Sequence, residues 1–110
     1  MKWVNIASWI KQFDVKFKSS FVLMAQRAKD EKNPYAEKYE ARQILEDMLN
    51  QIQAEWEEQS DLIKVIKALI YCKLGSNYYD AEEISDSYRN HEQSYKLWKN
   101  LSSEIRLRFA

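Results

Sequence analysis

The two side chains best suited to chemistry near neutral pH occur once each in this sequence, as Cys72 and His91. A thiol becomes a nucleophile beside a base or a cation, and an imidazole acts as an acid or base when it can reach a substrate. Neither residue has such a companion nearby, so we expect Cys72 to be a buried, inert thiol and His91 to pack on a helix. A single cysteine excludes an internal disulfide and, with a single histidine, a Cys/His zinc site within the chain.

Other chemical patterns are missing from the sequence too. It has no Gly-rich phosphate loop and no nucleophile elbow. Its fifteen aromatic residues follow helical spacing, which favours a packed core over a ligand box. The pair Tyr78–Tyr79 is an exception, because adjacent residues point to different faces of a helix and one of them should lie outside the core. We therefore expect a protein that is not an enzyme and that binds no cofactor or metal.

The composition predicts an all-α protein. The 110 residues include one Gly and one Pro, too few for the turns of a β-sandwich or barrel, and 45% are apolar, enough for a core. Basic and acidic groups cancel, which argues against a nucleic-acid binder. No apolar run approaches the ~20 residues that span a bilayer. Lys11 and Gln12 interrupt the opening apolar stretch, so we expect no secretory signal and a cytoplasmic location.

Apolar residues spaced three and four apart predict four helices. They cover about 5–29, 34–55, 61–79 and a last segment from about residue 86. The first segment has an apolar face containing Phe13, Phe17 and Phe21, which we expect to bury against a matching stripe on the second. That stripe consists of Tyr35, Tyr39, Ala41, Ile44, Leu45, Met48, Leu49, Ile52 and Trp56. The third segment is apolar nearly all round, which is typical of a central helix. The apolar face of the last segment consists of Tyr88, His91, Tyr95, Trp98, Leu101 and Ile105. Short connectors predict two antiparallel hairpins, 1–56 and 57–110.

The third helix resembles the first helix of a tetratricopeptide repeat, which carries an aromatic residue, then Leu-Gly, then Tyr. The matching residues are Tyr71, Leu74, Gly75 and Tyr78. Gly75 could end this helix or let the last helix approach closely. By analogy with the repeat, these four positions would face the paired helix. The groove-facing, partner-binding positions would be Leu69, Cys72, Ser76 and Tyr79.

Charge is uneven along the chain although it sums to zero. Residues 1–30 carry a net charge of +4, residues 31–62 a net charge of −6, and residues 63–110 a net charge of +2. The acidic middle includes a cluster formed by Glu55, Glu57, Glu58 and Asp61. This cluster has two interpretations, a solvated loop or a landing site for a basic protein surface.

Two longer runs resemble the N-terminal region of the KIF-binding protein family. One is Pro34-Tyr35-Ala36-Glu37-Lys38-Tyr39-Glu40-Ala41-Arg42, followed by Gln43-Ile44-Leu45-Glu46. The other is Leu74-Gly75-Ser76-Asn77-Tyr78-Tyr79-Asp80-Ala81-Glu82-Glu83-Ile84. Both occur in the order found in the family. The link between the second and third helices is shorter here than in vertebrate members, and about three extra residues precede the last helix.

The resemblance implies a tetratricopeptide-like α-solenoid that binds kinesin motor domains and keeps them off the microtubule. Family members act in microtubule organisation, axon growth and organelle transport, so a cytoskeleton-associated location is expected. Two alternatives stay open. The chain could be a structural N-terminal cap or generic helical adaptor without kinesin contact, and the basic, amphipathic first helix permits binding to a membrane surface.

Overall fold

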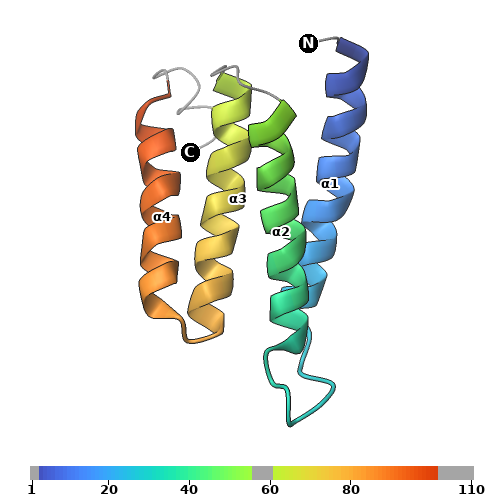
Figure 1. Ribbon diagram of the computed structural model, residues 1–110, viewed down its shortest axis with the longest axis vertical. Helices are drawn as coiled ribbons and strands as arrows, with labels where there is room; N and C mark the ends of the chain where they lie inside the picture. Colours follow the sequence, from blue (N-terminus) through green and yellow to red (C-terminus); the bar gives the residue numbers. More distant parts are fainter. Residues whose placement is uncertain (1–2, 56–60, 102–110) are drawn as a thin grey trace.

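The computed structural model describes residues 3–55 and 61–101, and all of the regular structure in these ranges is helical. The four helices are α1 (Trp3–Ala25), α2 (Ala36–Glu55), α3 (Asp61–Asp80) and α4 (Ile84–Lys99), as Figure 1 shows. The prediction of an all-α chain with about four helices is confirmed for these residues. Helix α2 begins two residues after the predicted Pro34, and α4 begins slightly before the predicted start.

The helices follow one another side by side. Helix α1 packs on α2, α2 on α3 and α3 on α4, so that α1 and α4 lie at opposite edges and α3 lies between α2 and α4 (Figure 1). The core forms where α2 meets α3. Its fully or almost fully buried members are Leu45, Met48, Ile52, Ile63, Ile66, Ile70 and Leu74. The apolar stripe predicted for α2 therefore faces the core at Leu45, Met48 and Ile52, whereas Tyr39, also predicted to belong to it, is 47% exposed.

Helix α1 is less buried than its sequence predicts. Phe13 and Phe17 stack at 5.2 Å between ring centroids and are half-buried against the core. Phe21, predicted to bury against α2, is 44% exposed, and that prediction is wrong. Its ring instead lies under the ammonium group of Lys73 on α3, 3.4 Å from the ring centroid. A cation on the ring face replaces the apolar contact that the spacing alone suggested.

Helices α3 and α4 meet through small residues. The hydroxyl of Ser87 donates to the carbonyl of Gly75 at 2.7 Å, and that of Ser94 donates to the carbonyl of Ala68 at 2.7 Å. Gly75 lies inside α3, and a Cβ placed on it would come within 2.6 Å of the His91 ring. Of the two interpretations of Gly75, close helix approach is confirmed and the end of a helix is wrong.

Only part of the predicted apolar face of α4 packs on α3. Tyr88 is 70% exposed, Tyr95 is 66% exposed, and His91 is exposed beyond its contact with Gly75. The interpretation of Tyr88 and Tyr95 as core residues is therefore wrong, whereas the His91 ring packs against Gly75 on α3, as expected. Close approach requires small side chains where the backbones meet, so Ser87 and Ser94 face α3 and Tyr88 and Tyr95 turn outward. Leu101 is buried as predicted, and Ile105 lies outside the described residues.

Candidate protein-binding face and polar network

The four predicted partner-facing positions lie along one side of α3. Tyr79 is 63% exposed, Leu69 is 42% exposed, Cys72 is exposed and Ser76 is half-buried. We call these four residues the α3 strip. The expectation of a buried thiol at Cys72 is wrong, because α3 uses other sides for α2 and α4 and nothing among the described residues covers this one.

Lys73 and Phe21 border the α3 strip on the side of α1. The ammonium group of Lys73 is partly buried over the Phe21 ring, and this burial lowers the pKa of Lys73. Because Phe21 is itself partly exposed, apolar surface extends from α3 toward α1. This side of the molecule therefore combines the exposed apolar groups of Leu69, Tyr79 and Phe21 with the ammonium group of Lys73.

The four repeat-like positions point away from the strip. Leu74 and Gly75 are buried, whereas Tyr71 and Tyr78 are half-buried. The hydroxyl of Tyr78 donates to Glu46 Oε1 on α2 at 3.1 Å. Burial of its ring and this hydrogen bond to a carboxylate raise the pKa of Tyr78, so the phenol stays neutral. The repeat analogy placed all four residues against the paired helix, α4. Gly75 does pack against His91 of α4. Tyr71 and Tyr78 instead bond to Gln53 and Glu46 of α2, so the prediction is wrong for the two tyrosines.

Most of the acidic cluster cannot be placed. Glu57 and Glu58 lie outside the described residues, as does the side chain of Glu55, the last residue of α2. Asp61 is the first residue of α3 and is half-buried. A landing site formed by these four residues stays a prediction.

A polar network that the sequence analysis did not single out joins α2 to the C-terminal end of α3. Its centre is Asn77, which is completely buried. Arg42 Nε donates to Asn77 Oδ1 at 2.8 Å, and Asn77 Nδ2 donates to the carbonyl of Lys38 at 2.7 Å. Both ends of the buried amide are therefore paired, which offsets the cost of removing it from water.

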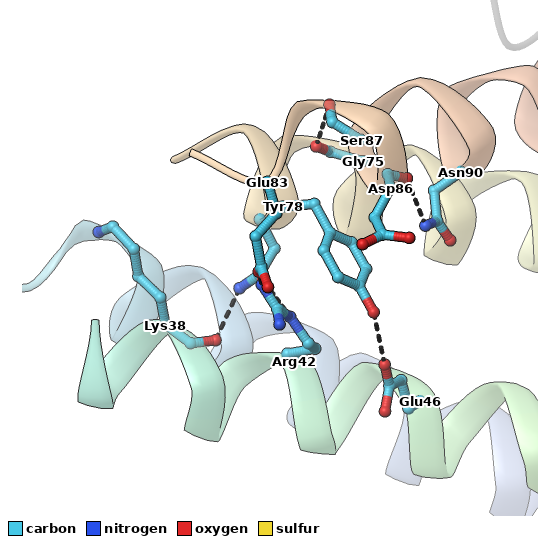
Figure 2. A network of polar contacts seen from close by, with 10 residues as sticks. Lys38, Arg42, Glu46, Gly75, Tyr78, Glu83, Asp86, Ser87 and Asn90 are labelled. Carbon is cyan, nitrogen blue, oxygen red and sulfur yellow. Dashed lines mark hydrogen bonds and ion pairs between the residues drawn. The ribbon is translucent and has the colours of Figure 1, made fainter. Parts of the chain in front are cut away.

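Arg42 is enclosed by aromatic rings and an acidic partner. Its guanidinium lies 3.8 Å from the ring centroid of Tyr78 and 4.8 Å from that of Tyr39. It also forms an ion pair with Glu83, and the Arg42 side chain is only 13% exposed (Figure 2). The planar guanidinium can stack on rings and donate in its own plane at the same time, which a lysine could not do.

Glu82 and Glu83 belong to the turn that ends α3. The amide of Glu82 donates to the Tyr79 carbonyl at 3.0 Å, and the amide of Glu83 donates to the Tyr78 carbonyl at 2.9 Å, the pattern of a Schellman motif. Glu82 occupies the left-handed position with φ of 63°, where glycine is usual. Its carboxylate accepts a hydrogen bond of 2.5 Å from the Tyr35 hydroxyl, and this bond raises the pKa of Tyr35.

The network has a signal in the sequence. Asn77 continues the buried series Ile66, Ile70 and Leu74 at helical spacing, so a polar residue occupies an apolar position. Asn77 lies in one of the two runs that carry the family resemblance, and its partners Arg42 and Lys38 lie in the other. Those runs therefore contact each other, and the polar residues described above are paired with one another. This arrangement fits a structural joint between α2 and the end of α3.

The described residues hold no group of three or more His, Cys, Asp or Glu side chains placed to bind a metal ion. Within the same ranges, no helix is long and apolar enough to cross a membrane. Comparisons of the chain with protein-family models, with curated proteins and with solved structures gave no significant match. The family resemblance in the two runs therefore stays a prediction.

Proposed function

We propose that this chain is a protein-binding module, built as a tetratricopeptide-like helical array, that docks on a partner through the α3 strip. The supporting observation is the exposure of Leu69, Cys72 and Tyr79 along one side of an otherwise well-packed helix. Keeping large apolar side chains in water is unfavourable, and contiguous exposed apolar patches commonly mark interaction surfaces. These positions also coincide with the partner-facing positions of the repeat analogy.

The partner that we propose is a kinesin motor domain, whose attachment to the microtubule the chain would block. Two features of the sequence support this choice. The runs around Arg42 and Asn77 resemble the KIF-binding protein family, and residues 31–62 carry a net charge of −6. A motor surface that meets acidic tubulin is basic, and opposite charge favours encounter. The module would then act in the cytoplasm, on microtubule organisation and axonal transport.

The test is a titration of kinesin motor domains with the chain and with variants of the α3 strip. We expect Leu69→Glu and Tyr79→Glu each to weaken binding about tenfold or more, as removal of a central apolar contact does. Tyr95→Glu is the matched control, because Tyr95 is as exposed as Tyr79 but lies on α4. Circular dichroism of each variant would verify that it folds.

Two results would contradict the proposal. If no motor domain binds the wild-type chain, or if the strip variants bind as tightly as the control, the strip does not contact a motor. The chain would then be a structural cap. Charge reversal of Glu55, Glu57, Glu58 and Asp61 tests the acidic cluster separately. We expect it to slow association, most strongly at low salt, where charges are least screened.

A further inference from the structure

A cation lies beside the α3 strip. Lys73 is half-buried at the edge of the strip, and its ammonium group lies 3.4 Å from the centroid of the Phe21 ring on α1. Two exposed leucines share this side of α3, because Leu69 and Leu62 precede Lys73 by four and by eleven residues, close to one and three turns. The positive charge therefore lies within a mainly apolar surface.

This cation has no anionic partner in the part of the chain that the structure describes, where the ion pairs involve other residues. Asp80, the nearest acidic residue along α3, follows Lys73 by seven residues, about 10 Å along the helix axis. The face of an aromatic ring attracts a cation but does not neutralise it. Burial disfavours the charged form and lowers the pKa of Lys73, so a carboxylate beside the ammonium group would be stabilising.

The surroundings of Lys73 indicate what kind of molecule brings that carboxylate. The Phe21 ring covers one side of the ammonium group, and an ammonium group has three N–H donors, so donors remain for an acceptor on the strip. A small anion would use these donors but would leave Leu62 and Leu69 in water. A protein segment that carries an acidic side chain among apolar ones satisfies both the charge and the leucines.

We infer that Lys73 determines the specificity of the α3 strip by binding an Asp or Glu side chain that the partner protein presents within an apolar segment. Phe21 holds the ammonium group at the edge of the strip, and Leu62 and Leu69 contact the apolar residues of the segment. Docking excludes water and strengthens the ion pair. A segment without the carboxylate would bury the charge of Lys73 unpaired, which is unfavourable. The inference rests on the proposed function, because it names the chemistry that the same strip selects.

Titration of a kinesin motor domain with Lys73 variants tests the inference. We expect Lys73→Met, which keeps an apolar stem, to weaken binding about tenfold, and Lys73→Glu to weaken it further, because like charges would then meet. Lys64→Met and Lys64→Glu are the matched controls, because Lys64 is also half-buried but lies nine residues away, on the opposite side of α3. If Lys73→Met binds like the wild type while Leu69→Glu still weakens binding, the inference is wrong and the docking surface stands.

A probe that needs no motor domain separates the inference from the choice of partner. Three leucine-rich peptides would differ only in a central Glu, Gln or Lys. We expect the wild-type chain to bind the Glu peptide about tenfold more tightly than the Gln peptide, and Lys73→Glu to prefer the Lys peptide. Selection of the Glu peptide without binding of any motor domain would support the inference and contradict the motor function. A wild-type chain that binds none of the peptides or does not distinguish Glu from Gln, or a selectivity that Lys73→Glu leaves unchanged, would overturn the inference.

Discussion

Helix α3 meets its two neighbours in opposite ways. Its contact with α4 is close at Gly75 and Ala68, where two serine hydroxyls bond directly to the α3 backbone and the His91 ring packs on Gly75. Its polar contact with α2 uses long side chains, with Arg42 reaching Asn77 and Glu83. The α3–α4 interface brings the two backbones close together at Gly75 and Ala68. The polar part of the α2–α3 interface is bridged by charged and aromatic side chains.

The difference indicates how each interface can fail. A close interface has no space for added atoms, so it should be sensitive to increased volume. A bridged interface contains buried polar atoms that are paired only with one another, so it should be sensitive to loss of a partner. Substitutions that add volume or remove a polar group should therefore have different effects at the two contacts.

The largest effect is expected from Asn77→Leu, which keeps the branched shape of the side chain but removes both amide hydrogen bonds. Arg42 and the Lys38 carbonyl would lose a buried partner, and we expect the free energy of unfolding to fall by about 3 kcal/mol. Urea denaturation followed by circular dichroism would measure it. Asn50→Leu on the exposed side of α2 is the control, with an expected change within about 0.5 kcal/mol.

Removing the charge as well sharpens this prediction. In the double variant Arg42→Met/Asn77→Leu the guanidinium no longer lacks a partner, so its loss of stability should be smaller than the sum of the two single losses. If the loss in the double variant equals the sum of the two single losses, Arg42 and Asn77 are not energetically coupled. The description of the α2–α3 contact as bridged by these two residues would then be wrong.

A smaller effect is expected from Gly75→Leu at the close interface, about 2 kcal/mol of destabilisation through overpacking. Gly75 has no positive φ, so the cost arises from the clash with His91 and not from backbone strain. Thermal unfolding would show it as a lower midpoint. The clash can be tested in a chain that already carries His91→Ala. With the imidazole ring removed, Gly75→Ala should raise the free energy of unfolding by about 0.5–1 kcal/mol. An unchanged midpoint for Gly75→Leu would contradict close approach.

The smallest effect is expected at the turn that the two interfaces share. Glu82→Gly relieves the left-handed conformation but loses the bond to Tyr35, whereas Glu82→Ala only loses the bond. The glycine variant should therefore be the more stable of the two by about 1 kcal/mol, as measured by chemical denaturation. Tyr35→Phe serves as a control for the hydrogen bond alone. A more stable alanine variant would show that Glu82 leaves the left-handed region in solution.

Much of the fold follows from the sequence alone. The near absence of Gly and Pro and the steps of three and four residues determined that the described chain is helical and roughly where each helix lies. They also identified the buried positions of α2, such as Leu45 and Ile52, because apolar residues at steps of three and four mark the side of a helix that faces the core. The repeat analogy added that Gly75 and Leu74 face inward while Leu69 and Tyr79 face outward.

Only the tertiary structure decided which face α4 turns toward α3. Periodicity finds an apolar stripe but does not say that Ser87 and Ser94, which permit closer approach, occupy the contact while Tyr88 and Tyr95 face water. The pairing of Arg42 with Asn77 could not be predicted either, because the two are far apart in sequence and meet only once α2 lies on α3. Spacing along the chain fixes the faces of one helix, whereas the choice among faces depends on the shape of its neighbour.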